Sequence, residues 1–339
     1  MKKEAMFYDK LGEGKVKCRL CPHDCVLKDG QVGICGVRQN VGGTLYTLVY
    51  GKAIAVHVDP IEKKPLFHVY PGTRSFSLAT VGCNFRCKFC QNADISMVRL
   101  RHGEEAPGQD FPPEEVVRLA VRYDCKTIAY TYTEPTIFYE YAYDTATLAV
   151  KHDILNVFVT NGFISQDALR HISPVLHAVN VDLKGWSETY YRKIVGGRLQ
   201  PILDNLKLMK KLGIWVEVTT LCVPGYVDTD EQFRSIARFI RDELGPETPW
   251  HVSRFYPHYQ MTDVPPTPVA VLKRAREIGL EEGLRYVYSG NVPGDEGEHT
   301  YCYQCGEVLI RRWGFTIVDY NIRDGKCPKC GAVIDGLGM

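Results

Sequence analysis

The stretch SFSLATVGCNFRCKFCQN, residues 75–92, decides the fold of this chain and carries its chemistry. Its first part alternates apolar and small polar residues, which is typical of a β-strand with one buried face. Its second part holds three cysteines in the spacing CxxxCxxC, at Cys83, Cys87 and Cys90. Three thiolates can bind three irons of a [4Fe–4S] cluster and leave the fourth iron open to a further ligand. The stretch therefore predicts a strand that ends in a catalytic metal site.

A regular alternation of strands and helices continues from residue 75 to about residue 290. Apolar runs rich in β-branched residues predict strands at 75–81, 126–132, 154–160, 178–183, 214–222 and 250–256, with a short seventh at 284–288. Capped amphipathic segments predict helices at 113–123, 136–150, 165–172, 200–212, 229–243 and 267–282. This order predicts an α/β fold with a parallel sheet and helices outside it.

The two flanks break this rhythm and predict a chain of three domains. Residues 1–74 carry four cysteines and strand-like segments, and we expect a small Cys-rich and β extension there. Residues 75–290 form the central α/β domain. Residues 291–339 carry two CxxC pairs around a hairpin-like segment, which predicts a zinc-ribbon-like module.

The composition excludes several classes of protein. The chain has 339 residues, 45% of them apolar, which argues against wholesale disorder. Lys+Arg 41 and Asp+Glu 40 leave a charge of +1, so electrostatics give no reason to expect a nucleic-acid partner. The sequence has no apolar run of the ~18 residues that a membrane span needs and no signal-peptide pattern at its start. We therefore expect a cytoplasmic protein without a membrane partner.

Eleven of the thirteen cysteines fall in three short clusters, a usage that in a reducing compartment points to metal. The C-terminal cluster pairs Cys302-x2-Cys305 with Cys327-x2-Cys330. Four thiolates on two tight turns suit tetrahedral zinc, and rubredoxin-type iron fits the same spacing. Cys125 and Cys222 stand apart in strand-like segments, which predicts buried core thiols.

The N-terminal cluster combines Cys18-x2-Cys21-x3-Cys25 with Cys35. Four ligands at these positions could close around zinc or complete an auxiliary iron–sulfur cluster. We favour zinc or another structural metal here. His23 lies within the cluster and is expected to be a loop residue rather than a ligand.

The CxxxCxxC loop directly after a first strand resembles the signature of the radical S-adenosylmethionine (SAM) superfamily. The resemblance implies a partial (β/α)6 barrel of the TIM-barrel kind, with a [4Fe–4S] cluster on the three cysteines and SAM on the open iron. It further implies that the reduced cluster gives an electron to SAM, which breaks into methionine and a 5′-deoxyadenosyl radical. That radical takes a hydrogen atom from a substrate or adds to it.

The end of the second predicted strand carries a carboxylate that the resemblance assigns to SAM. Members of the superfamily have a Gly-Gly-Glu-Pro segment here that contacts the SAM ammonium. This chain keeps Glu134-Pro135 but has Tyr132 and Thr133 in place of the glycines. Glu134 is therefore a predicted cofactor-binding residue, and the alternative is a carboxylate that only caps the following helix.

Polar residues also close the third and fourth predicted strands. Thr160-Asn161 resembles a Thr-Asn-Gly turn of the activating enzymes and could bind SAM, or it could be turn chemistry alone. Asp182 and Lys184 alternate onto one strand face that points into the barrel interior. In the activating enzymes the matching Asp-x-Lys reaches SAM and the substrate backbone, and the alternative is an interior ion pair.

The sixth predicted strand ends in the segment WHVSRFYPHY, residues 250–259. Activating enzymes place a histidine that contacts SAM near this point. Arg254 and His258 are the predicted cofactor-binding residues here.

Three segments together resemble a narrower group: CRLCPHDC…GICGVR, the core stretch above, and AYTYTEPTIF. The group is the AmmeMemoRadiSam system radical SAM enzymes, related to pyruvate formate-lyase activating enzyme. The resemblance implies a one-electron donor of flavodoxin or ferredoxin type, Memo-like and AMMECR1-like partner proteins, and a protein or peptide substrate. A small molecule, lipid or nucleoside is the alternative substrate. A non-catalytic zinc-ribbon interaction protein is the alternative function.

Overall fold

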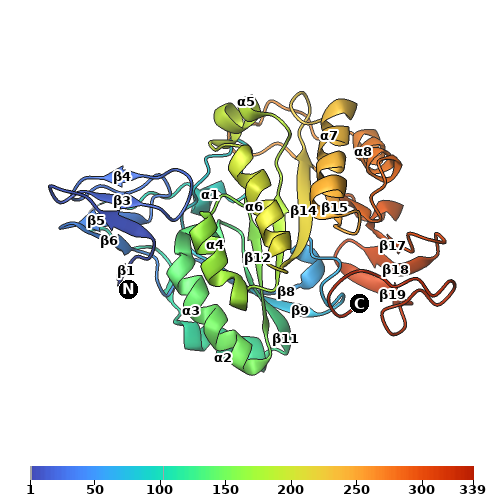
Figure 1. Cartoon of the computed structure of the whole chain (residues 1–339), viewed down its shortest axis with the longest axis horizontal. Helices are drawn as coiled ribbons and strands as arrows, with labels where there is room; N and C mark the ends of the chain where they lie inside the picture. The colour runs from blue at the N-terminus through green and yellow to red at the C-terminus, as the bar shows by residue number, and fades with distance from the viewer. Residues whose placement is uncertain (1, 102) are drawn as a thin grey trace.

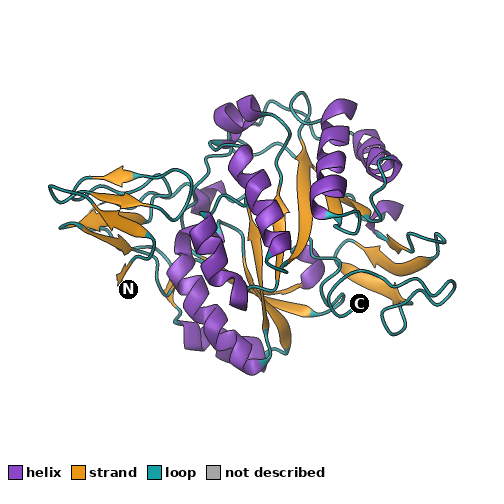
Figure 2. Ribbon diagram, viewed as in Figure 1, coloured by secondary structure: helices purple, strands orange, loops and turns teal. Residues whose placement is uncertain are grey.

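The computed structural model describes residues 2–101 and 103–339, and an eight-stranded sheet forms the centre of this described part (Figures 1 and 2). The order of strands across the sheet is β16-β15-β14-β13-β12-β11-β9-β8. Their bounds are β8 Ala55–Pro60, β9 Arg74–Ala79, β11 Cys125–Tyr130, β12 Leu155–Thr160, β13 Ala178–Asp182, β14 Trp215–Cys222, β15 Trp250–Arg254 and β16 Val287–Gly290. The pairs from β9 to β16 are all parallel, and the edge strand β8 runs antiparallel to β9. The α/β fold with a mostly parallel sheet is thus confirmed.

Helices follow the strands in the predicted order and pack against the sheet (Figure 2). They are α2 Pro113–Arg122, α3 Tyr139–Ala149, α4 Gln166–Ile172, α6 Gln200–Lys211, α7 Asp230–Phe239 and α8 Val269–Glu281. The side chains of Ser165 and Thr229 accept hydrogen bonds at the starts of α4 and α7, as N-cap residues do. Gly213 follows α6 with a φ of +76°, a conformation that favours glycine at a helix end.

Two segments predicted as single helices change their pitch. The segment 136–150 begins with a 3₁₀ turn, η2 (Pro135–Phe138), before α3. Proline at the start of η2 fixes the backbone but donates no hydrogen bond, so a tight first turn suits it. The segment 229–243 ends in a π-helical turn, η6 (Ile240–Leu244), after α7.

The N-terminal region forms two small antiparallel sheets and then joins the main sheet. One sheet has the order β1-β6-β5 and the other β2-β3-β4. Their bounds are β1 Lys3–Glu4, β2 Tyr8–Lys10, β3 Val16–Cys18, β4 Val26–Leu27, β5 Arg38–Val41 and β6 Thr44–Thr47. Both stand at the left of Figure 1, away from the C-terminus. Since β8 also belongs to residues 1–74, this region contributes one edge of the central sheet.

The C-terminal region forms a three-stranded antiparallel sheet, β17-β18-β19, at the right of Figure 1. Its strands are β17 Thr300–Tyr301, β18 Val308–Trp313 and β19 Thr316–Tyr320. Leu309 and Ile310 of β18 are buried with Tyr286 and Tyr288 of the central domain and with Phe67 of the N-terminal region. The C-terminal sheet therefore shares its apolar core with the central domain.

The last residues of the chain lie along the segment that precedes β9. The backbone N–H of Leu337 donates to the carbonyl of His68 at 2.8 Å, and the N–H of Tyr70 donates to the carbonyl of Leu337 at 2.7 Å. Two parts of the chain that are far apart in sequence are joined by these two bonds.

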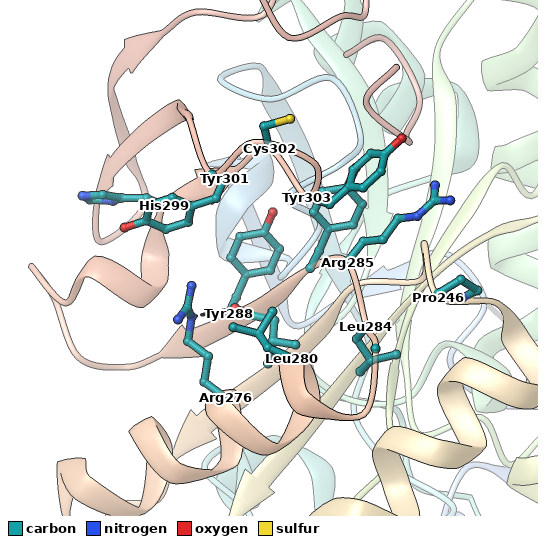
Figure 3. Close-up of a pocket in the computed structure, with 14 residues that line it drawn as sticks. Pro246, Arg276, Leu280, Leu284, Arg285, Tyr288, His299, Tyr301, Cys302 and Tyr303 are labelled. Atoms are coloured by element: carbon teal, nitrogen blue, oxygen red, sulfur yellow. Dashed lines mark hydrogen bonds between the residues drawn. The ribbon is translucent and has the colours of Figure 1, made fainter. Parts of the chain in front are cut away.

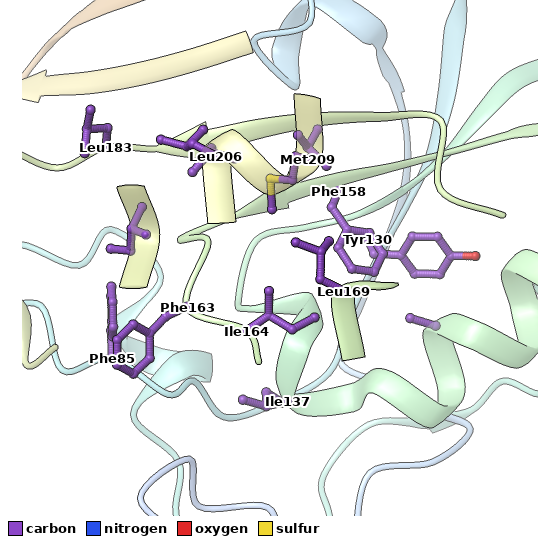
Figure 4. Close-up of a cluster of buried hydrophobic side chains, with 14 of the residues drawn as sticks. Phe85, Tyr130, Ile137, Phe158, Phe163, Ile164, Leu169, Leu183, Leu206 and Met209 are labelled. Carbon is purple, nitrogen blue, oxygen red and sulfur yellow. The ribbon is translucent and has the colours of Figure 1, made fainter. Parts of the chain in front are cut away.

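A large apolar cluster lies between the sheet and the helices, and the CxxxCxxC loop is anchored in it (Figure 4). Phe85 of that loop is buried and its ring centroid lies 5.1 Å from that of Phe163. Figure 4 shows Phe85 and Phe163 side by side beside Ile164 and Ile137. An aromatic anchor of this kind fixes the position of the cysteines on either side of it.

We expect Gly197→Ala to lower the free energy of unfolding by about 1–3 kcal/mol, because a Cβ there would overlap the ring of Phe85. Phe85 is enclosed in the core, so its ring has little room to move. Equilibrium urea unfolding checks the effect. Gly12→Ala is the matched control, since a Cβ at Gly12 meets open space. Equal stability of the two variants would contradict the prediction.

Within residues 2–101 and 103–339, no helix combines the length and apolar character that crossing a bilayer requires.

Candidate active site

A cavity of about 310 Å³ lies at the carboxyl ends of the parallel strands. Ligands of α/β proteins bind at this edge because the loops that follow the strands meet there. Residues from the ends of β11, β12, β13, β14 and β15 all reach the cavity. The predicted site residues that line it are Cys83, Cys87, Cys90, Glu134, Thr160, Asn161, Asp182 and Lys184.

The CxxxCxxC loop is held from both sides by backbone hydrogen bonds. Arg86 and Lys88 donate their N–H groups to Val195 and Ile194, at 2.9 and 3.0 Å. These two carbonyls belong to a π-helical turn, η5 (Tyr191–Val195). The Arg86 guanidinium also donates to the carbonyls of Cys83 and Phe85, at 3.1 and 3.2 Å. These hydrogen bonds fix the backbone of the loop against η5.

The three thiols of this loop suit separate metal atoms. Among the described residues, which include every cysteine, these three sulfurs do not form a group within 4.8 Å of one another. Thiolates that bind different irons of a cubane cluster must stand apart in this way. The backbone N–H of Phe85 lies 3.3 Å from the sulfur of Cys83, and such hydrogen bonds tune the potential of a cluster. The residues thus fit the cluster that their spacing predicts.

Burial favours the protonated form of two of these thiols, Cys83 and Cys87. It raises the pKa of Cys87 to about 12, and the nearby Lys184 ammonium offsets only part of this effect. Burial also raises the pKa of Cys83, and the Glu134 carboxylate adds to the rise. Metal binding must therefore displace protons from these thiols.

Glu134 is buried at the wall of the cavity and accepts four hydrogen bonds. Its Oε1 accepts from the backbone N–H of Thr136 at 3.0 Å and from the hydroxyls of Thr136 and Thr160 at 2.6 and 2.7 Å. Its Oε2 accepts from the backbone N–H of Asn161 at 2.8 Å. Burial raises the pKa of Glu134, and these donors lower it in part. The carboxylate caps η2 and also lines the cavity, and its contact with SAM stays a prediction.

The polar residues after β12 fix Glu134 and the cysteine loop. Asn161 donates through Nδ2 to Oδ1 of Asn84, at 2.8 Å, and accepts from the backbone of Phe163 at 2.9 Å. Asn84 in turn donates to the carbonyl of Phe163. Thr160 and Asn161 therefore line the cavity while their side chains also position its walls.

Asp182 ends β13 and Lys184 lies just after it, and their side chains form an ion pair of 2.9 Å. Burial lowers the pKa of Lys184, but Asp182 and Cys87 raise it by more, so the ammonium stays charged. The side chain of Asp182 is 37% exposed, compared with 15% for Lys184. The carboxylate of Asp182 is thus accessible from the cavity while the ammonium lies deeper.

Arg254 and His258 stand outside the lining of this cavity among the described residues. The Arg254 guanidinium donates to the carbonyl of Thr267 at 2.8 Å and to the hydroxyl of Tyr256 at 3.1 Å. His258 hydrogen-bonds through Nδ1 to the carbonyl of Cys90 at 2.8 Å. His258 therefore supports the cysteine loop, and a cofactor contact for either residue stays a prediction.

Tyr132 takes the backbone conformation that glycine would favour at its position, with a φ of 63°. Its hydroxyl donates to Asp59 and lies 3.4 Å from the ammonium of Lys64. A bulky residue in this conformation is strained, and such strain is typical of functional sites. The chain thus keeps a glycine-like turn before Glu134 although both glycines are replaced.

Several lining residues were not predicted from the sequence. Ser96 has its hydroxyl 3.1 Å from the sulfur of Cys90, and Asn92 donates to the carbonyl of Tyr132 at 2.7 Å. Thr219 and Ser253 also line the cavity, from β14 and β15. Thr219 and Leu221 both face the cavity, so the two-residue period of a strand could have identified this face.

A larger cavity of about 560 Å³ lies between α8, β16 and the C-terminal sheet (Figure 3). Arg276, Arg285 and three labelled tyrosines surround it. Among the described residues its lining includes no carboxylate and no member of the CxxxCxxC loop. It is separate from the predicted catalytic site.

The four C-terminal cysteines converge on one point. Cys302, Cys305, Cys327 and Cys330 have their sulfurs within 4.8 Å of one another, with pairs at 3.5 and 3.7 Å. Burial raises the pKa of Cys302 to about 12. For Cys327, burial acts in the same direction, but backbone N–H groups of Cys330 and Lys329 and the neighbouring thiols bring its pKa down to about 7. This group could hold one metal ion.

The four N-terminal cysteines line a different, small cavity beside the CxxxCxxC loop. Cys18, Cys21, Cys25 and Cys35 all border it, with His23 among the other lining residues. The side chain of His23 hydrogen-bonds to the carbonyl of Asn84 at 2.7 Å. The predicted core thiols Cys125 and Cys222 are buried, as expected.

Comparisons with known proteins agree with this geometry. The profile described as the Radical SAM superfamily matches residues 77–240. An uncharacterized protein of Methanocaldococcus jannaschii is 50% identical over 335 residues, which cover 98% of this chain and 99% of that protein. Pyruvate formate-lyase 1-activating enzyme of Escherichia coli is 25% identical over 175 residues, 51% of this chain and 70% of that enzyme.

A solved structure has a similar fold. The crystal structure of Streptococcus suis SuiB bound to S-adenosylmethionine gives a TM-score of 0.51 at 13% identity, covering 68% of this chain and 53% of that one. The superfamily implies a [4Fe–4S] cluster and SAM, which the three cysteines and the polar cavity fit. The chain is therefore a radical SAM enzyme, built on a radical SAM superfamily domain with distant homology to the pyruvate formate-lyase activating enzymes.

Proposed function

We propose that this enzyme cleaves SAM at the Cys83, Cys87 and Cys90 site and uses the resulting radical to modify a protein or peptide. The observation that carries this proposal is the meeting of three separated thiols, a buried carboxylate and an ion pair in one cavity. When bound, the reduced cluster supplies one electron to SAM, which yields methionine and the 5′-deoxyadenosyl radical.

The chain's own residues bind and orient SAM in this proposal. Glu134 accepts a hydrogen bond from the SAM ammonium, because its Oε2 accepts from the N–H of Asn161 and can accept from one more donor. Lys184 lies beside Asp182 and Cys87 and contributes positive charge near the SAM carboxylate. Phe85 and Phe89 are buried next to the cysteines and exclude water from them. A partial (β/α)6 barrel is the architecture that we propose for the parallel strands β9, β11, β12, β13, β14 and β15 and the helices that follow them.

A protein or peptide substrate is supported by two observations. The relatives include activating enzymes. Gln91 and Asn291 line the cavity and are exposed, so the cavity is open at the surface where a large substrate could dock. A small molecule, lipid or nucleoside is the alternative substrate. A complete reaction that proceeds without any added macromolecule would favour this alternative.

We propose further partners from the resemblance of the N-terminal and central motifs to the AmmeMemoRadiSam system enzymes. They are a one-electron donor of flavodoxin or ferredoxin type and Memo-like and AMMECR1-like proteins in the cytoplasm. We also propose that the C-terminal four cysteines hold zinc, with rubredoxin-type iron as the alternative. The sulfur pairs at 3.5 and 3.7 Å support one tetrahedral ion.

Anaerobic reconstitution with iron and sulfide, reduction with dithionite and addition of SAM tests the function. We expect 5′-deoxyadenosine and methionine from the wild type and none above background from Cys87→Ala. Cys125→Ala is the matched control. Cys125 is a buried thiol at the start of β11, and the cavity lies at the other end of that strand. A cluster whose EPR spectrum does not respond to SAM would overturn the proposal.

A further inference from the structure

The loops around β3 and β4 bring four cysteines to one small apolar cavity. The backbone N–H of Cys18 donates a hydrogen bond to the carbonyl of Cys25 at 2.9 Å. Cys21 and Cys35 complete the set, and the cavity between them measures about 20 Å³. The rest of the wall consists of the apolar residues Leu20, Leu27, Ile34 and Ile137, together with Gly33 and the polar residues His23, Arg38 and Thr136. All four thiols are free of disulfides.

The separation of these sulfurs argues against a single zinc ion. At a Zn–S distance of about 2.3 Å, tetrahedral geometry places the sulfurs about 3.8 Å apart. The C-terminal cysteines have this spacing, with pairs at 3.5 and 3.7 Å. Among the described residues, however, no three of the four N-terminal sulfurs lie within 4.8 Å of one another.

The size of the cavity that the four N-terminal cysteines line also argues against a single zinc ion. A closed tetrahedral zinc site leaves no room at its centre for anything but the ion. Here the cavity of about 20 Å³ exceeds the ~10–15 Å³ that one water molecule requires. The site has room for a core larger than one ion, with affinity for thiolates.

A buried donor without a partner also lines this cavity. The guanidinium of Arg38 binds Glu140 and the carbonyl of Met6, but its Nε has no hydrogen-bond partner among the described residues. An unsatisfied buried N–H is costly unless a ligand accepts from it. The sulfides and thiolates of an iron–sulfur cluster are acceptors of this kind, and N–H groups that donate to them tune its potential.

From the spacing, the cavity and the free donor together, we propose that Cys18, Cys21, Cys25 and Cys35 bind a second [4Fe–4S] cluster. It replaces the structural zinc that we favoured from the sequence. Each of the four cysteines binds one iron, so this cluster has no open position and carries no SAM.

The proposed cluster shares a wall with the catalytic loop. The N–H of Cys83 donates to the carbonyl of Cys35 at 3.3 Å, so the two Cα atoms lie at most about 7.5 Å apart. Gly82 has no room for a Cβ, which would meet the carbonyl oxygen of Cys35 at 2.8 Å. The two cysteine clusters are thus joined by backbone contacts. The second site does not depend on SAM cleavage, so it can be tested separately from the proposed function.

The test is a count of iron, inorganic sulfide and zinc in the reconstituted full chain and in Cys87→Ala/Cys90→Ala, which removes ligands of the catalytic site. We expect about eight irons and eight sulfides per chain in the wild type and about four of each in the variant. Sulfide distinguishes a cluster from rubredoxin-type iron, which contains none. The variant retains every residue of the proposed site, so its sulfide count does not depend on the folding of an N-terminal mutant.

The complementary variant Cys21→Ala/Cys25→Ala should also fall to about four irons and four sulfides. The C-terminal variant Cys305→Ala/Cys330→Ala is the matched control and should keep all the sulfide of the wild type. A Cys87→Ala/Cys90→Ala protein without sulfide, or a wild type with about two zinc ions per chain, would overturn the inference. Failure of SAM cleavage alone would leave these counts unchanged and would affect only the proposed function.

Discussion

Replacing Glu140 by alanine is expected to lower the free energy of unfolding by about 3–5 kcal/mol. Both carboxylate oxygens of Glu140 lie 2.9 Å from Nη1 of Arg38, and the two side chains are 1% and 2% exposed. The same carboxylate accepts from the backbone N–H of Met6 at 2.7 Å. Without it, the guanidinium stays buried with its charge uncompensated, which is the costly way to break a buried pair.

Equilibrium urea unfolding followed by tryptophan fluorescence measures this effect. Glu115→Ala is the matched control, because Glu115 pairs with Arg118 at 2.6 Å on the surface of α2. Exposed pairs contribute about 0–1 kcal/mol, so this variant should unfold nearly as the wild type does. A loss below about 1 kcal/mol for Glu140→Ala would show that the buried pair does not hold the N-terminal sheets to α3.

Replacing Glu134 by glutamine is expected to weaken SAM binding by about 10- to 100-fold. A hydrogen bond to a charged group contributes about 1.5–3 kcal/mol, and each 1.4 kcal/mol is a factor of ten in affinity. Glutamine keeps the shape of the side chain and can still accept from Thr136 and Thr160. It removes the charge that faces the cavity, and its amide would oppose the N–H of Asn161.

Equilibrium dialysis of SAM against the reconstituted protein measures this affinity, with unfolding by urea as a check on the fold. Glu298→Gln is the matched control, because Glu298 is a buried carboxylate that accepts two backbone N–H bonds and is not among the residues that line the catalytic cavity. Unchanged affinity in Glu134→Gln would exclude a contact with the SAM ammonium.

The carboxyl group of Glu134 also determines the direction in which SAM affinity changes with pH. Burial raises the pKa of Glu134, so its carboxylate protonates at a higher pH than an exposed glutamate would. SAM affinity should therefore fall as the pH drops through this raised pKa. In Glu134→Gln the corresponding fall should be absent.

The parallel strands and the catalytic loop could be predicted because their signals are local. The apolar runs that became β12 and β14, for example, are continuous in sequence. The position of β8 could not be predicted in this way. Its pairing with β9 is antiparallel and interrupts the β-α-β order, and only tertiary packing decides which edge a short alternating strand covers.

The candidate site residues also differ in whether local sequence signals predict their positions. Glu134 and Asp182 lie at strand ends whose direction follows from the parallel sheet, so their convergence could be anticipated. Arg254 also ends a strand, but its long side chain turns to the carbonyl of Thr267, a choice that no sequence period reveals. The N-terminal cysteines show a further limit, because spacing identifies ligands but not the distance between their sulfurs.

The pairing of Leu337 with His68 and Tyr70 links the stability of the C-terminal sheet to that of the catalytic strand. The segment 68–70 leads into β9, and β9 leads into the CxxxCxxC loop. Phe67 completes the apolar core of the C-terminal sheet. A ligand that binds only the folded form of that sheet stabilises everything that unfolds together with it. Any metal held by the C-terminal cysteines would thus raise the melting temperature of the catalytic domain as well, and chelating it would also loosen the CxxxCxxC loop.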